Sequence, residues 1–193
     1  MAARVVVLAS GSGTVLQALL DAASSGDLSA AIVAVGTDVE DAPALGRATA
    51  SGIATFVCRP TDHFDRAAWN TALLQALDSW QPDLIVTAGF MRILGPTIID
   101  AFPGRIINTH PALLPAFPGA HPVRDALAHG VKVTGCTVHV VDHGMDTGPI
   151  LAQRAVDILE GEDEAALHER IKAVERELLV STVAQLTSDR RDR

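Results

Sequence analysis

The chain has 193 residues, of which 48% are hydrophobic, with a formal net charge of −8 and a mean hydropathy of +0.27. This length suffices for one core but not for two full-sized domains, so we expect a single domain over residues 1–193. The negative charge excludes a broad nucleic-acid surface, because phosphate neutralisation needs clustered Lys and Arg. The longest apolar runs are far shorter than the roughly 18 residues of a membrane span, so we expect no membrane association.

The N-terminus and the two cysteines predict a cytoplasmic protein. The opening residues MAARVVVLASGSG hold only a short apolar run and no small-residue cleavage site of a signal peptide. Cys58 and Cys136 are far apart and lack CxxC spacing. That spacing favours two reduced core thiols over a disulfide framework or a zinc site.

Short apolar runs alternate with alanine-rich segments of helical spacing along the first 110 residues. The runs are Val5–Ala9, Ala31–Val35, Ala54–Cys58, Leu84–Ala88 and Ile106–Ile107. Such alternation is typical of βαβ units, and nearly continuous apolar strands are expected when helices cover both faces of a parallel sheet. The sequence therefore predicts an α/β fold with a doubly wound, mostly parallel sheet.

From Val133 onward the pattern changes. Two strand-like runs are joined by the Gly-rich segment Asp142–Pro149, which predicts a C-terminal addition resembling a β-hairpin. A long amphipathic helix follows, with acidic residues in its first turn and one apolar stripe. The stripe consists of Leu167, Ile171, Val174 and Leu178.

The segment LASGSGTVLQALL predicts a strand, a tight turn and a helix that begins near Thr14. Gly11 and Gly13 let the backbone approach a ligand, and the free N–H groups and dipole of the helix favour a phosphate. We therefore favour a monophosphate site over a plain turn. A dinucleotide site would need a third glycine where the chain has Leu16, although Asp38 would suit a ribose.

Asn108 and His110 lie on the same side of the strand predicted at Ile106–Thr109, because side chains alternate along a strand. They fall at its carboxyl end, where a doubly wound sheet opens its crevice, and the prolines that follow restrict the next loop. A fixed amide donor beside an imidazole suits a developing oxyanion. A purely structural role is equally frequent for this pattern.

The segment VDHGMDTGP offers a carboxylate to this pair. Asp142 or Asp146 would orient His110 and stabilise its charged form, and spacing alone does not choose between them. Turn chemistry is the alternative explanation for Asp and Gly here. We expect no metal, since the histidines form no HxxxH-like pair, and no serine hydrolase, since Ser12 lacks the G-x-S-x-G context.

Five blocks, in order, resemble those of the phosphoribosylglycinamide formyltransferases, a folate-dependent family of purine synthesis: VLASGSGT, PDLIVTAGFMRIL, NTHPALLPAFPGAH, DTGPIL and LHERIKAVE. The likeness runs over nearly the whole chain and implies a Rossmann-like formyltransferase fold. It implies a catalytic trio of Asn108, His110 and Asp146, and so selects the second aspartate.

The resemblance also implies binding residues. The substrate phosphate would lie on Gly11, Ser12, Gly13 and Thr14, the ribose phosphate near Lys172 and Glu175, and the folate at Phe90, Met91, Arg92, Ile93 and Leu94. Periodicity alone puts Lys172 and Glu175 on a solvated charged face. Many relatives carry Asn at the position of Val15, so phosphate contacts there would come from backbone N–H groups. The family likeness also implies a cis bond at Leu114-Pro115.

The expected reaction moves a formyl group from the co-substrate 10-formyltetrahydrofolate to the amine of glycinamide ribonucleotide. Both partners are small molecules, with no nucleic acid and no membrane, and the protein would be a monomer or homodimer. A formyltetrahydrofolate hydrolase is one alternative, although it usually carries an N-terminal regulatory domain. A methionyl-tRNA formyltransferase would need a further C-terminal domain and a basic face. A non-catalytic dinucleotide-binding module would use Gly11, Gly13 and Asp38.

Overall fold

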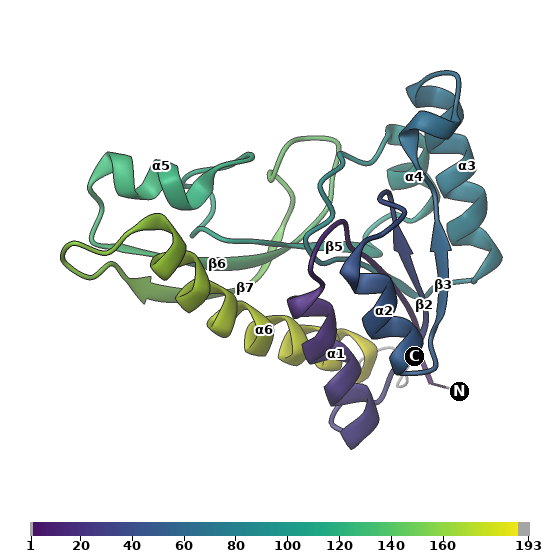
Figure 1. The fold of residues 1–193 in the computed structure, drawn as a ribbon, viewed down its shortest axis with the longest axis horizontal. Coiled ribbons are helices and arrows are strands. Elements are labelled where there is room, and N and C mark those ends of the chain that lie inside the picture. The colour runs from purple at the N-terminus through teal and green to yellow at the C-terminus, as the bar shows by residue number, and fades with distance from the viewer. Residues whose placement is uncertain (1, 189–193) are drawn as a thin grey trace.

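The computed structural model describes residues 2–188 (Figure 1). Within them, strands form one sheet in the order β3-β2-β1-β4-β5-β6-β7. The strands are β1 (Arg4–Leu8), β2 (Ala31–Thr37), β3 (Ala54–Val57), β4 (Leu84–Thr87), β5 (Ile106–His110), β6 (Val133–Val140) and β7 (Ile150–Asp157). The helices are α1 (Thr14–Ser25), α2 (Pro43–Ala50), the 3-10 turn η1 (Pro60–Asp62), α3 (Arg66–Ser79), α4 (Pro96–Ala101), α5 (Pro122–His129) and α6 (Glu164–Ser188).

The doubly wound topology is confirmed. Strands β1 to β5 pair in parallel, whereas β6 and β7 are antiparallel additions at one edge. The predicted strands all form, but β5 continues to His110, beyond the apolar pair that marked it in the sequence. The extra residues remain extended because β6 pairs with them, with His110 opposite Thr137. The Leu114-Pro115 bond is cis, as the family likeness implied.

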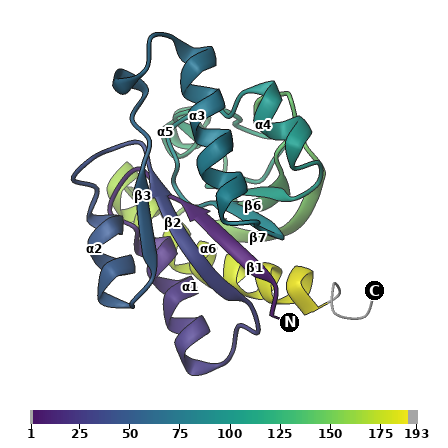
Figure 2. The ribbon, with the colours of Figure 1, turned by 90° about the vertical axis from the view of Figure 1, so that its right-hand side faces the viewer.

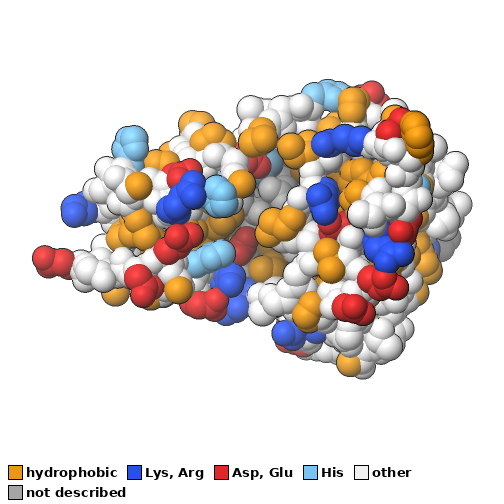
Figure 3. Space-filling view, turned by 45° about the horizontal axis from the view of Figure 1, so that its top comes forward, with side chains coloured by type: hydrophobic (Ala, Val, Ile, Leu, Met, Phe, Trp, Pro, Cys, Tyr) orange, Lys and Arg blue, Asp and Glu red, His pale blue; other side chains and the backbone are white. Residues whose placement is uncertain are grey.

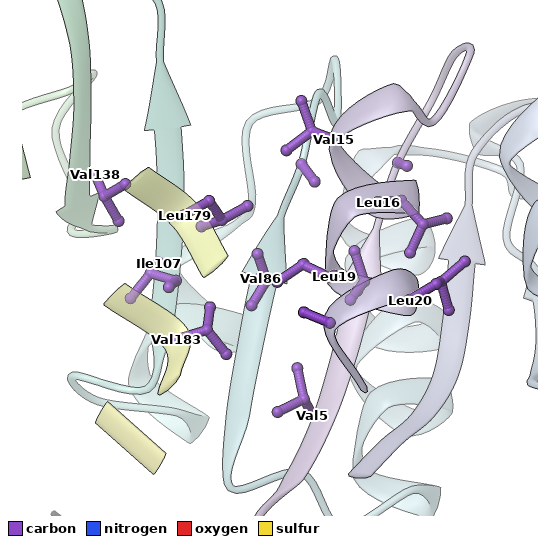
Figure 4. Close-up of a cluster of buried hydrophobic side chains, with 14 of the residues drawn as sticks. Val5, Val15, Leu16, Leu19, Leu20, Val86, Ile107, Val138, Leu179 and Val183 are labelled. Carbon is purple, nitrogen blue, oxygen red and sulfur yellow. The ribbon is translucent and has the colours of Figure 1, made fainter. Parts of the chain in front are cut away.

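Helices cover both faces of the sheet. The helices α1, α2 and α6 lie on one face, and α3 and α4 lie on the other (Figure 2). In the first layer, Leu19 of α1 lies beside Val86 of β4 (Figure 4). Leu179 and Val183 of α6 lie near Ile107 of β5 in the same view. Each such fully buried side chain contributes about 1.5–3 kcal/mol of transfer free energy, so this layer holds α6 firmly against the strands.

The apolar stripe predicted for the last helix is confirmed. Leu167, Ile171 and Leu178 are buried, and Val174 is half-buried against the same cluster. No helix among residues 2–188 is long and apolar enough to cross a membrane. Both cysteines are buried and free, as their spacing predicted.

The loop between β6 and β7 folds back over the face of the sheet that carries α3 and α4. Val141 packs into that layer, and His143 Nε2 lies 3.1 Å from Asp100 Oδ1 on α4. Strands β6 and β7 pair in antiparallel fashion, which confirms the predicted hairpin, and their loop lines the same cleft as the end of β5.

Candidate active site

A cleft of about 630 Å³ opens at the carboxyl ends of β1, β4 and β5. The hollowed face is seen in the space-filling view, with hydrophobic, basic and acidic side chains around it (Figure 3). All the predicted site residues line this cleft: Gly11, Ser12, Gly13, Thr14, Phe90, Met91, Arg92, Ile93, Leu94, Asn108, His110, Asp146, Lys172 and Glu175. The fold thus gathers segments that are far apart in the sequence.

His110 is 4% exposed, and its ring is held from both sides. Its Nε2 atom lies 2.8 Å from the carbonyl oxygen of Phe117, which only accepts, so Nε2 carries a hydrogen. Its Nδ1 atom lies 3.5 Å from Asp146 Oδ2, an ion-pair distance when the ring is charged. In the neutral ring Nδ1 is therefore an acceptor, and only the imidazolium donates from Nδ1.

Asp146 is held in an unusual backbone conformation, with φ at 55°. This left-handed region costs a residue with a Cβ on the order of 1 kcal/mol, and such strain is concentrated at functional sites. The carboxylate Oδ2 accepts the N–H of Gly119 at 2.8 Å. Burial raises the pKa of Asp146, but the contacts with His139, the Gly119 N–H and His110 together lower that pKa below its ordinary value. Asp146 is thus a charged partner for His110.

The amide of Asn108 is oriented by a neighbouring strand. Thr87 Oγ1 donates to Asn108 Oδ1 at 2.7 Å, which fixes the carbonyl side and leaves the NH₂ group as the donor. Asn108 Nδ2 lies 3.3 Å from His139 Nε2 and also faces the cleft. The amide is therefore preorganised as a donor at the same strand end as His110.

His139 is a site residue that the sequence reasoning missed. It is buried, its Nδ1 donates to the Val140 carbonyl at 3.0 Å, and its Nε2 lies 3.6 Å from Asp146 Oδ1. It pairs directly across the ladder from Asn108. The only signal in the sequence was a polar residue within an apolar strand run, which does not reveal its partner.

The predicted phosphate loop is braced by α2. Ala44 N–H donates to the Gly11 carbonyl at 3.2 Å, and Arg47 Nε donates to the Ser12 carbonyl at 2.8 Å. Gly13 has φ of +68°, and a Cβ there would lie 2.9 Å from the Ala44 Cα. Only glycine fits this turn. With two carbonyl oxygens bonded to α2, and no side-chain cap on α1, the N-terminal N–H groups of α1 are available to an anion.

The predicted folate segment is held through Ser10 and Asp38. Met91 N–H donates to Ser10 Oγ at 2.8 Å, Ser10 donates to Asp38, and Arg92 Nε donates to Asp38 Oδ2 at 2.6 Å. Met91 is nevertheless 77% exposed, and Ile93 is exposed beside it. The loop therefore presents apolar side chains to the cleft. Because Asp38 is buried and already paired, it is not free for the ribose of a dinucleotide.

The last helix, α6, brings a buried carboxylate to the cleft, whereas periodicity predicted a solvated charged face. Glu175 is 6% exposed, which corrects the expectation of a solvated face, because α6 packs on β6 and β7 and Glu175 contacts Thr109 of β5. Lys172 is half-buried, and its Nζ lies 2.8 Å from Glu169 Oε1. His168 also lines the cleft and was not predicted. Helical spacing could have placed it beside Lys172, one turn away.

Together these side chains suit addition to a carbonyl group. An amide N–H and an imidazolium N–H at one strand end stabilise negative charge on an oxygen, and a carboxylate stabilises the imidazolium. Among residues 2–188, no group of three or more His, Cys, Asp or Glu side chains could hold a metal ion.

The chain matches the formyl transferase family over residues 3–183 and belongs to that family. It is 59% identical over 186 residues to the phosphoribosylglycinamide formyltransferase of Mycobacterium tuberculosis (strain ATCC 25618 / H37Rv), covering 96% of this chain and 86% of the relative. Within the family it is grouped with the phosphoribosylglycinamide formyltransferases, as its motifs indicated.

Solved structures agree with this assignment. The glycinamide ribonucleotide transformylase 1 of Symbiobacterium toebii superposes with a TM-score of 0.96 at 42% identity, covering 98% of this chain and 89% of that one. The glycinamide ribonucleotide transformylase 1 of Geobacillus kaustophilus gives a TM-score of 0.94 at 45% identity, covering 97% of this chain and 100% of that one. The Rossmann-like formyltransferase fold implied by the motifs is confirmed.

Proposed function

We propose that this cleft transfers the formyl group of 10-formyltetrahydrofolate to the amine of glycinamide ribonucleotide, giving N-formylglycinamide ribonucleotide and tetrahydrofolate in purine synthesis. The observation that carries the proposal is the joint placement of Asn108 and His110 at the end of β5, with the Asp146 carboxylate beside Nδ1 of the imidazole. The loop before α1 and the apolar loop at residues 90–94 line the same cleft as that pair.

In this proposal each substrate has its own part of the cleft. The phosphate binds the N–H groups at Gly11–Thr14, and the ribose lies against α6 at Lys172 and Glu175. The pteridine of the folate packs on the loop at residues 90–94, whose exposed Met91 and Ile93 suit a flat aromatic ligand. The local positive potential of α1 and Lys172 offsets the overall negative charge of the protein.

The neutral amine of the ribonucleotide attacks the formyl carbon, and the carbonyl electrons move to oxygen. Asn108 Nδ2–H and His110 Nδ1–H donate to that oxygen as it becomes an anion. His110 must be protonated for this step, because the Phe117 carbonyl already takes its Nε2–H. The charge on Asp146 favours that protonated form.

Collapse of the tetrahedral intermediate breaks the bond between the formyl carbon and N10 of the folate. The attacking nitrogen loses one proton and N10 gains one, so the net reaction balances without a covalent enzyme intermediate. Asp146 or a water molecule accepts the proton, since an imidazolium cannot. An oxyanion donor contributes about 10² to 10³ in rate, and an acid or base about 10² to 10⁴.

The two small substrates are the only partners that this proposal requires. A cytoplasmic location is supported by the two free cysteines, which are typical of a reducing compartment. A monomeric or homodimeric state remains a prediction.

The deciding assay follows folate absorbance with and without glycinamide ribonucleotide. Turnover that depends on the acceptor supports the transferase, whereas equal turnover without it would indicate a formyltetrahydrofolate hydrolase. Tight NAD binding with no folate turnover would indicate a dinucleotide-binding module instead.

A further inference from the structure

Thr109 lies between Asn108 and His110 in β5, but its side chain is on the opposite face of the sheet. Its hydroxyl donates to Glu175 Oε1 of α6 at 2.8 Å. Thr109 is 7% exposed and Glu175 is 6% exposed, so little water competes for this hydrogen bond. One strand thus carries the predicted catalytic pair on one face and a contact to the ribose-side helix on the other.

Within residues 2–188, the Thr109 hydroxyl is the only group that hydrogen-bonds the Glu175 side chain. The residue also lines the cleft, so the second carboxylate oxygen remains available to a ligand. Lys172 and Arg176 act on Glu175 by charge alone, and on β6 the buried Cys136 thiol faces it. Burial raises the pKa of Cys136 to about 12, so that thiol is neutral. The orientation of the carboxylate therefore depends on Thr109.

We propose that Thr109 is a positioning residue that aims the Glu175 carboxylate at the ribose of the acceptor substrate. It thereby sets the ribose-binding helix at a fixed distance from the strand that carries Asn108 and His110. The inference rests on the proposed function, in which Glu175 holds the ribose.

The first test is Thr109→Val, which keeps the shape and strand preference of the side chain and removes only the hydroxyl. We expect the KM for glycinamide ribonucleotide to rise roughly tenfold, since a hydrogen bond to a charged group is lost. The kcat and the KM for the folate should change by less than about twofold, because Asn108 and His110 lie on the other face. Thr109→Ser, which restores the donor, should recover most of the affinity.

A pH profile separates positioning from general loosening of the fold. Burial raises the pKa of Glu175, and the Thr109 hydroxyl acts against that rise by bonding the ionised form. In Thr109→Val the pKa should rise further. As the pH is lowered, the KM for the ribonucleotide should therefore begin to rise at a higher pH in Thr109→Val than in the wild type. The pH profile of kcat should be the same in both proteins.

The matched control is Thr182→Val on α6. Thr182 is also buried, and its hydroxyl donates to the Leu178 carbonyl within the helix, away from the cleft. This variant loses a comparable hydrogen bond and should leave both KM values unchanged. In a Glu175→Ala background, Thr109→Val should add less than about a twofold effect, because no carboxylate remains to be positioned.

An unchanged KM in Thr109→Val, or an equal rise in Thr182→Val, would overturn the role of Thr109. Failure of Thr109→Ser to recover the affinity would do the same. Direct calorimetric titration with the ribonucleotide gives the comparison without turnover. If the wild type shows no acceptor-dependent turnover and no ribonucleotide binding, the proposed function itself fails, which is a different result.

Discussion

The Nε2 atom of His110 lies 2.8 Å from the carbonyl oxygen of Phe117, and this hydrogen bond makes the protonation state of the ring decisive. With Nε2 occupied, Nδ1 is the ring atom left for the reacting carbonyl group. It donates only when the ring is charged. The nearby carboxylate of Asp146 favours that state, so the two residues are expected to act as one unit.

Asp146→Asn tests this unit. The substitution keeps the side-chain shape and tolerates the left-handed backbone, but removes the charge that favours the imidazolium. We expect kcat to fall about 10²-fold or more at neutral pH, with KM values changed less than about threefold. Steady-state rates across pH at saturating substrates measure this, and near-normal turnover at neutral pH would show that the trio is misassigned.

Arg47 is expected to govern phosphate affinity without touching the reacting groups. Its guanidinium bonds the Ser12 carbonyl and, at 3.0 Å, the Gln17 side chain, and so braces the loop from α2. A lysine ammonium lacks the planar guanidinium that bonds both groups at once. Arg47→Lys should therefore raise the KM for glycinamide ribonucleotide by about three- to tenfold and leave kcat unchanged.

Arg154→Lys on β7 is the control for Arg47, since the Arg154 guanidinium donates to the neighbouring Gln153 carbonyl. It should leave the kinetics unchanged. Weaker competitive inhibition by inorganic phosphate in Arg47→Lys would locate the effect at the loop. Unchanged inhibition would remove Arg47 from phosphate binding.

The sequence alone predicted those features of the site that depend on local periodicity. Side-chain alternation placed Asn108 and His110 on one face, and the glycines of the first turn predicted a tight turn before α1, because both depend on residues close together in the chain. Asp146 was different. Its approach to His110 depends on how far the loop between β6 and β7 folds back, and only the family likeness selected it over Asp142.

Two further features depend on packing between distant elements. Periodicity alone put Glu175 on a solvated face, yet it is buried because α6 crosses β5 at Thr109. His139 joins the site because β6 pairs with β5 in the register that sets it opposite Asn108. Neither helix crossing nor strand register is encoded by a local pattern.

Glu169→Gln tests whether Lys172 is drawn away from the substrate. The Lys172 Nζ lies 2.8 Å from the carboxylate of Glu169, which is 68% exposed, so the pair is weak and a phosphate can displace it. Removing this competitor should lower the KM for glycinamide ribonucleotide about two- to threefold at low salt, and less at roughly 0.15 M ionic strength. Glu177→Gln on the same helix removes an equal charge and should have a smaller effect. Equal effects would mean that only net charge matters.

Glu175→Gln should make the protein more stable and weaken its affinity for the ribonucleotide. Burial raises the pKa of this carboxyl above its ordinary 4.5, so the folded state favours the protonated form. The favourable contribution of Glu175 is therefore fully present below pH 4.5 and is lost as pH rises through the higher folded-state pKa. The neutral amide avoids that loss and still accepts from Thr109.

At neutral pH we therefore expect the free energy of unfolding of Glu175→Gln to exceed that of the wild type by on the order of 1 kcal/mol. The difference should shrink as the pH falls and should vanish below pH 4.5, where the wild-type carboxyl is protonated in both states. Urea unfolding at several pH values measures the difference, and kinetic assays of the same samples should show a raised KM for the ribonucleotide. A wild type that is more stable than the variant at neutral pH would mean that Glu175 is stabilised as a carboxylate, and its burial would then need no functional explanation.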